Sequence, residues 1–263
     1  MKNILPSIAL ALIAGLTGSQ AADNVTTSNI TSTSPTSSSG LGYGNITSTI
    51  PSNSTFSFGS RYAILNLDLI NGIVGSFNTT PAGQGFINST SEWIDAVQSK
   101  SNTSSGSYDP LTIYTRIYFS TPQTPELGLG VPFSNIAQGF GNITESSETG
   151  ELYPAFAEKV LDTDVILQKT RFYAGAGNGL EEILRANKID TVVLSGVRTS
   201  GVILTTAIRL YDLDYNVYII SDNVIETPPD NGINKSILEE IFPKFVGMQV
   251  ISLEQAKGAL ERS

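Results

Sequence analysis

The 263-residue chain contains neither cysteine nor histidine. Without cysteine it has no disulfide framework and no thiolate nucleophile. Without histidine it has no Ser-His-Asp triad and no His-ligated metal. We predict that the chain binds neither a metal nor a cofactor. Charge is also scarce, with 15 Lys and Arg against 24 Asp and Glu and a net charge of −9. This balance disfavours nucleic acids and anionic membranes as partners.

The first 21 residues have the pattern of a secretory signal peptide. Lys2 precedes an apolar run from Ile4 to Leu16, and Ser19-Gln20-Ala21 supplies the small residues typical of a cleavage site. The run is too short to span a bilayer, and a buried N-terminal helix is the alternative. We therefore predict a signal peptide over residues 1–21 and a secreted, extracellular protein without a membrane anchor after cleavage.

Residues 22–60 are rich in Ser and Thr, and no charged residue occurs between Asn24 and Ser60. Such a composition buries too little apolar surface to offset the entropy of ordering, which predicts a disordered, glycosylated tail. Sequons of the Asn-x-Ser/Thr type occur in this segment and beyond it. The predicted glycosylation sites are Asn24, Asn29, Asn45, Asn53, Asn78, Asn88, Asn102, Asn142 and Asn234.

From residue 61 onward, short and nearly continuous apolar runs alternate with segments of helical periodicity. The runs predict strands buried on both faces, over residues 62–68, 111–118, 164–168, 191–195 and 216–220, with a weaker one at 248–251. Helices are predicted over residues 179–187, 202–213 and 233–241. The alternation predicts an α/β domain over residues 61–263, with three α/β/α layers and a largely parallel six-stranded, Rossmann-like sheet.

Three polar features stand at the expected strand ends, where such folds place their sites. Asp68 closes the first run, and a carboxylate there is a candidate acid or base, although it could simply cap a loop. Lys169 follows an apolar run and needs a partner such as Asp68, unless it is solvated. The turn Gly196–Gly201 precedes a predicted helix and can offer backbone N–H groups to an anion.

These segments, in this order, resemble the isochorismatase-like hydrolases, a group that includes isochorismatases, nicotinamidases and N-carbamoylsarcosine amidohydrolases. Ala63-Ile64-Leu65-Asn66-Leu67-Asp68 is similar to the family's first strand with its active-site Asp, and Val165–Phe172 is similar to the strand that ends in the active-site Lys. Gly196-Val197-Arg198-Thr199-Ser200-Gly201-Val202 looks like the Gly-x-x-Thr-Ser-Gly-Cys turn of the carbamoylsarcosine-type members. The resemblance covers about 200 residues from Tyr62 onward.

The resemblance implies that Asp68 and Lys169 are catalytic and that Val202 occupies the place of the nucleophilic cysteine. It also implies a cis peptide between Val197 and Arg198, with the N–H groups of Arg198 and Val202 facing a common point for an oxyanion. Arg198 would in addition bind an acidic substrate.

Valine cannot form a thioester, so we do not expect a cysteine-dependent amidase. One hypothesis is a hydrolase that uses the Asp-Lys pair on a small molecule, as isochorismatases do on a vinyl ether without a cysteine. The alternative is an inactive pseudoenzyme of the same fold that binds a ligand or partner. A structural cell-wall glycoprotein is a third possibility, and members of the fold family often form homo-oligomers.

Overall fold

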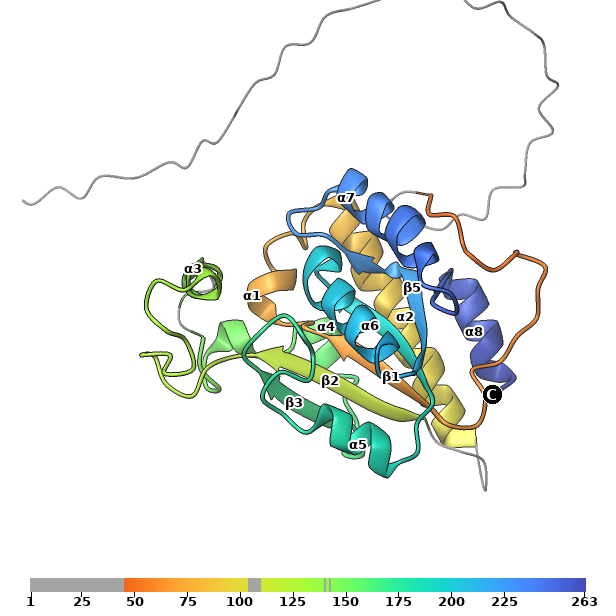
Figure 1. The fold of residues 1–263 in the computed structure, drawn as a ribbon, viewed down its shortest axis with the longest axis horizontal. Helices are drawn as coiled ribbons and strands as arrows, with labels where there is room; N and C mark the ends of the chain where they lie inside the picture. The colour runs from red at the N-terminus through yellow and green to blue at the C-terminus, as the bar shows by residue number, and fades with distance from the viewer. Residues whose placement is uncertain (1–44, 104–109, 140, 142) are drawn as a thin grey trace, which may run out of the picture. The chain divides into compact units, whose positions relative to one another are not determined.

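The computed structural model describes residues 45–103, 110–139, 141 and 143–263 (Figure 1). Within this part of the chain, one sheet of six parallel strands has the order β3-β2-β1-β4-β5-β6. The strands are β1 (Tyr62–Leu67), β2 (Leu111–Ile117), β3 (Val165–Lys169), β4 (Thr191–Val197), β5 (Asn216–Ile225) and β6 (Gln249–Ile251). Every residue of the central strands β1 and β4 is buried, as expected for a sheet covered on both faces. The predicted α/β fold class is confirmed.

Helices cover both faces of the sheet. In Figure 1, α5 (Leu180–Ala186) and α6 (Leu204–Tyr211) lie in front of the sheet, and α2 (Pro81–Thr103) and α8 (Leu253–Glu261) lie behind it. Leu180 and Leu184 of α5 pack with Leu65 of β1 in the front core, whereas α2 and α8 contribute to the rear core. These two apolar layers fix the orientation of the strand ends that carry the polar side chains.

Shorter helices lie in the connections between these elements. They are α1 (Asn71–Val74), α3 (Pro132–Gly139), α4 (Pro154–Ala157), α7 (Asn231–Lys235), the 3₁₀ turns Glu148–Gly150 and Phe242–Lys244, and the π-helical turns Thr199–Ile203 and Ser236–Ile241. The helix predicted over 202–213 therefore starts at Thr199 as a π-helical turn before it continues as α6. Asp230 caps α7 by accepting a hydrogen bond from the backbone N–H of Ile233 at 3.0 Å.

Residues 45–60 lie against the domain. The Thr49 N–H donates to the Val250 carbonyl at 2.9 Å, the Phe56 ring stacks on Tyr218, and Phe58 is 2% exposed. The prediction of a disordered tail over 22–60 is therefore wrong for residues 45–60, because their aromatic side chains bury enough apolar surface to order the segment. Residues 22–44, like the predicted signal peptide, lie outside the described residues.

The predicted glycosylation sites differ in exposure. Asn45, Asn53 and Asn88 are exposed, whereas Asn78 is partly buried and its amide donates to the Tyr153 hydroxyl at 3.1 Å. Asn234 is completely buried and its side-chain oxygen accepts a hydrogen bond from Thr199. A folded domain leaves no room for a glycan there, so we expect Asn234 to be unoccupied in the folded protein. Asn24, Asn29, Asn142 and the side chain of Asn102 lie outside the described part.

None of the helices in the described part of the chain is long and apolar enough to cross a membrane.

Candidate active site

The strand order creates a topological switch point at the carboxyl ends of β1 and β4. Chain connections leave these neighbouring strands toward opposite edges of the sheet, β1 toward β2 and β4 toward β5. Ligands bind at such a switch point in open α/β sheets. Asp68 directly follows β1, the turn Arg198–Val202 follows β4, and Lys169 ends β3 two strands away. The topology thus brings all three predicted features to the same end of the sheet, where the strands terminate.

Asp68 and Lys169 form a buried ion pair. The Lys169 Nζ lies 2.6 Å from Asp68 Oδ2, and the side chains are 0% and 5% exposed, respectively. The same ammonium donates to the carbonyl oxygens of Arg171 at 2.7 Å and Phe172 at 3.3 Å. An ammonium has three N–H donors, so this set of acceptors uses all of them. Lys169 is therefore held by its own loop and by Asp68.

Thr115 of β2 fixes the other oxygen of the Asp68 carboxylate. The Thr115 hydroxyl donates to Asp68 Oδ1 at 2.8 Å and accepts from the Asp68 N–H at 3.1 Å. The backbone of Asp68 has a positive φ of 56°, so the extended conformation of β1, in which side chains alternate between the two faces of the sheet, ends at this residue. Each carboxylate oxygen then has one donor in place and retains a further lone pair.

Burial dominates the protonation of this pair. Loss of solvation raises the pKa of Asp68 above its usual value, and the attraction of Lys169 and the hydrogen bond from Thr115 oppose that rise. The same loss of solvation lowers the pKa of Lys169, against the attraction of Asp68. The carboxyl group therefore keeps its proton to higher pH than an exposed aspartate does, which is a property that a general acid needs.

The turn after β4 packs tightly against β1. The Val197–Arg198 peptide is cis, as the family resemblance implied. Gly196 has a φ of 142°, and a Cβ atom at this position would lie 2.2 Å from the Leu67 carbonyl oxygen. Only glycine fits this approach of the two strands. Val202 lies in the π-helical turn, is 1% exposed and belongs to the apolar core in front of the sheet.

Arg198 carries the most exposed charge of the turn. Its side chain is 37% exposed, its guanidinium lies over the Phe172 ring at 5.3 Å, and its Nε lies 3.6 Å from Glu226 Oε1. Glu226 follows the end of β5, is 4% exposed on its side chain and accepts the Ser200 N–H on Oε2 at 2.8 Å. A carboxylate at the start of a helical turn is favourably placed against the backbone dipoles. Glu226 thereby holds Arg198 beside the turn, with the Arg198 side chain partly exposed to solvent.

Comparison with known proteins identifies the family. The family model described as "Isochorismatase domain" matches residues 62–255. The chain belongs to the isochorismatase family.

Relatives support the fold. An isochorismatase family protein from Burkholderia thailandensis superposes with a TM-score of 0.63 at 25% identity, covering 79% of this chain and 100% of that one. The N-carbamoylsarcosine amidase of Thermoplasma acidophilum gives a TM-score of 0.53 at 19% identity, with coverage of 74% and 97%. The uncharacterized isochorismatase family protein YrdC of Bacillus subtilis is 39% identical over 64 residues, which are 24% of this chain and 34% of the relative.

In this isochorismatase family member, the structure brings Asp68, Lys169, Arg198 and Val202 to the same end of the sheet. The residues that sequence reasoning missed are Thr115 and Glu226. Thr115 gave no signal, because a threonine inside a strand is common. Glu226 is an acidic residue just after an apolar segment, and this signal could have been found if the fifth strand had been extended beyond Ile220.

No cluster of three or more metal-ligating side chains occurs among the described residues. The donor set at the site is one carboxylate paired with an ammonium and a second paired with a guanidinium. The chemistry available to these residues is proton transfer and the binding of negative charge.

Proposed function

We propose that this protein is a secreted hydrolase of the isochorismatase family that acts on a small molecule through Asp68, without a covalent enzyme intermediate. The observation that carries the proposal is the buried contact of 2.6 Å between Asp68 and Lys169, with Thr115 on the second carboxylate oxygen. By the family resemblance, Val202 replaces the nucleophile of the amidases. Its side chain offers no lone pair, so chemistry at this site proceeds by proton transfer.

The reaction class that suits a single carboxyl acid is vinyl ether hydrolysis. Asp68 gives its proton to the terminal vinyl carbon, and the ether oxygen stabilises the resulting cation. A water molecule then adds its oxygen to the cationic carbon and returns a proton to Asp68. The hemiketal hydroxyl then gives its proton to the ether oxygen, the bond between the central carbon and that oxygen breaks, and an alcohol and a ketone are released. The net reaction consumes one water molecule.

Lys169 and Arg198 have different parts in this proposal. All donors of Lys169 are in use, so it is a positioning residue that holds the Asp68 carboxylate. Arg198 is partly exposed and is the group that would bind an acidic substituent of the substrate. The N–H groups of Arg198 and Val202 would face the same space, in line with the oxyanion site implied by the resemblance.

The test is turnover by the purified full chain on isochorismate, on simpler vinyl ethers and on a panel of amides. We expect hydrolysis of vinyl ethers that falls by about 100-fold or more in Asp68→Asn, because the acid is lost. Asp95→Asn is the control, since Asp95 lies on α2 with its side chain 55% exposed. Equal turnover by the wild type and Asp68→Asn would refute the proposal.

One observation favours the alternative of a pseudoenzyme that binds a ligand. The side chains of Asp68 and Lys169 are at most 5% exposed, and Val202, at the place of the nucleophile, is 1% exposed. Little of the Asp-Lys pair is therefore open to a substrate. A rise in melting temperature with a substrate analogue, together with no turnover of any compound, would establish this alternative.

A further inference from the structure

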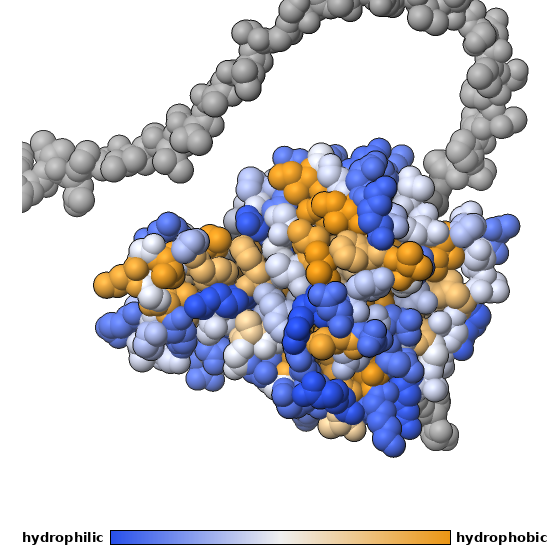
Figure 2. Space-filling view, in the orientation of Figure 1, coloured by the Kyte–Doolittle hydropathy of each residue, from blue (hydrophilic) through white to orange (hydrophobic). Residues whose placement is uncertain are grey.

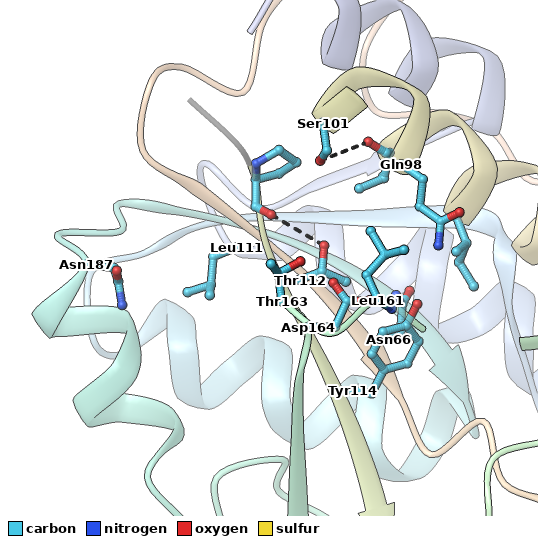
Figure 3. A pocket seen from close by; sticks show the side chains of 13 residues that line it. Asn66, Gln98, Ser101, Leu111, Thr112, Tyr114, Leu161, Thr163, Asp164 and Asn187 are labelled. Atoms are coloured by element: carbon cyan, nitrogen blue, oxygen red, sulfur yellow. Dashed lines mark hydrogen bonds between the residues drawn. The ribbon is translucent and has the colours of Figure 1, made fainter. Parts of the chain in front are cut away.

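A cavity lies away from Asp68 and Lys169, between α2 and the first half of β2. It has a volume of about 260 Å³ and is bordered by Asn66 of β1, Tyr114 of β2, Gln98 of α2 and the segment Leu161–Asp164 before β3. Figure 3 shows Asn66, Tyr114 and Asp164 grouped below Leu161, with Gln98 approaching from α2. Asp68, Lys169 and Arg198 do not border this cavity.

The inner end of the cavity holds polar atoms that the described residues leave unsatisfied. Asn66 and Tyr114 are register partners on β1 and β2 and are 1% and 0% exposed. The Tyr114 hydroxyl lies near the Asn66 amide, yet neither this hydroxyl nor Nδ2 or Oδ1 of Asn66 makes a hydrogen bond of acceptable geometry. Buried polar atoms are nearly always satisfied, and the poorly aligned contact between these two side chains leaves the Asn66 amide, with its donor and its acceptor, under-satisfied at a cost. Something that enters the cavity must therefore supply partners.

Asp164 adds an acceptor nearer the rim. Its Oδ2 accepts the Leu161 N–H at 2.9 Å, which leaves the rest of the carboxylate available. Burial raises the pKa of this group, and its charge acts on Tyr114. Apolar side chains of α2, Ile94 and Val97, complete the wall. The cavity thus combines an amide, a hydroxyl and a carboxylate with an apolar side and no cationic group.

We propose that this cavity is a binding site for a small, uncharged, polyhydroxylated molecule, of the size of a polyol or a monosaccharide. A hydroxyl group both donates and accepts, so neighbouring hydroxyls can satisfy the Asn66 amide and the Tyr114 hydroxyl and also donate to Asp164. An anion would meet the Asp164 carboxylate with no cation to offset it, and an apolar molecule would offer no hydrogen bond to the Asn66 amide, the Tyr114 hydroxyl or Asp164. The site is independent of the proposed hydrolase activity.

The experiment is a titration of the ¹⁵N-labelled full chain with glycerol, erythritol, myo-inositol and D-glucose, each followed by NMR and by calorimetry. We expect saturable binding of at least one of these probes, with a change in the side-chain amide signal of Asn66. Tyr114→Phe retains the shape of the wall and is expected to weaken binding by about tenfold, because one hydroxyl contact is lost. Asn66→Leu should abolish it.

Asn223→Leu is the matched control, because Asn223 is also fully buried with both amide atoms unpaired but lies outside the cavity. It should bind the probe as the wild type does. If Asn66→Leu and Tyr114→Phe bound the probes as tightly as the wild type does, the proposal would be overturned, since polyols also act on proteins without a specific site. Binding of none of the four probes would show that the cavity holds water only, and preference for acetate or acetamide over the polyols would refute the ligand class.

Discussion

Replacement of Lys169 by methionine tests the buried ion pair directly. The variant Lys169→Met keeps most of the apolar stem and removes the ammonium that lies 2.6 Å from Asp68. Asp68 then remains buried as an unpaired carboxylate with only the Thr115 hydroxyl as a side-chain donor. Because desolvation of an uncompensated charge dominates, the free energy of unfolding should fall by about 3–5 kcal/mol at neutral pH.

The loss should depend on pH in a defined direction. The folded-state pKa of Asp68 lies above its value of 3.8 in the unfolded chain, and removal of Lys169 takes away the charge that lowers it. A raised pKa in the folded state contributes stability that is complete below the unfolded pKa and is lost as the pH rises through the folded pKa. The deficit of Lys169→Met against the wild type should therefore be small near pH 4 and largest near pH 7.

The free energies of unfolding at about pH 4 and about pH 7 are measured by urea denaturation, followed by tryptophan fluorescence. Lys159→Met is the control, because Lys159 also lies 2.6 Å from a carboxylate, that of Asp95, with side chains 20% and 55% exposed. An exposed pair contributes about 0–1 kcal/mol, so this variant should lose little at either pH. If Lys169→Met lost the same free energy of unfolding at both pH values, or if Lys169→Met and Lys159→Met lost the same amount, the buried ion pair would not be the cause of the loss.

Three further predictions follow from the packing. Phe58→Ala should lower the free energy of unfolding by about 3–5 kcal/mol in the same assay, because the ring is 2% exposed and packs with side chains of α2 and α8. A loss below about 1 kcal/mol would show that residues 45–60 are not part of the domain. Thr115→Val should raise the pKa of Asp68 in a ¹³C carboxyl titration, because a donor to the carboxylate is lost, and an unchanged pKa would contradict the contact. Glycopeptide mapping of the protein from a eukaryotic host should find Asn234 without a glycan and exposed Asn88 with one. A glycan on Asn234 would contradict its burial.

Strand periodicity predicted the sheet well because parallel strands buried on both faces need continuous apolar runs. The long helix α2 escaped prediction for a physical reason. Its sequence between Pro81 and Thr103 contains glycine, serine, threonine and asparagine, which are poor helix formers. The helix is stabilised by tertiary packing of side chains such as Trp93 and Val97 in the rear core, and such contacts cannot be read from local propensity.

The residues of the candidate site that stand at the ends of apolar runs could be predicted from the sequence. Those whose position depends on strand register or strand length could not. Asp68 and Lys169 each follow an apolar run, so their meeting follows from a parallel sheet. The contact of Thr115 with Asp68 depends on the register of β2 against β1, which no local pattern specifies. Glu226 was missed because β5 continues past an irregularity in its pairing with β4 and ends at Ile225.

The hydrogen bonds already formed at the site limit which group can meet a substrate. Lys169 has no donor left, and the Ser200 N–H is taken by Glu226. The Arg198 Nε is itself buried and faces Glu226, but the Arg198 side chain as a whole is the most exposed of the four charged groups. The two ion pairs cancel, so the site has no net charge when all four groups are ionised. An acidic substituent therefore gains most by approaching Arg198, the one cationic group of the site whose side chain is more than one third exposed.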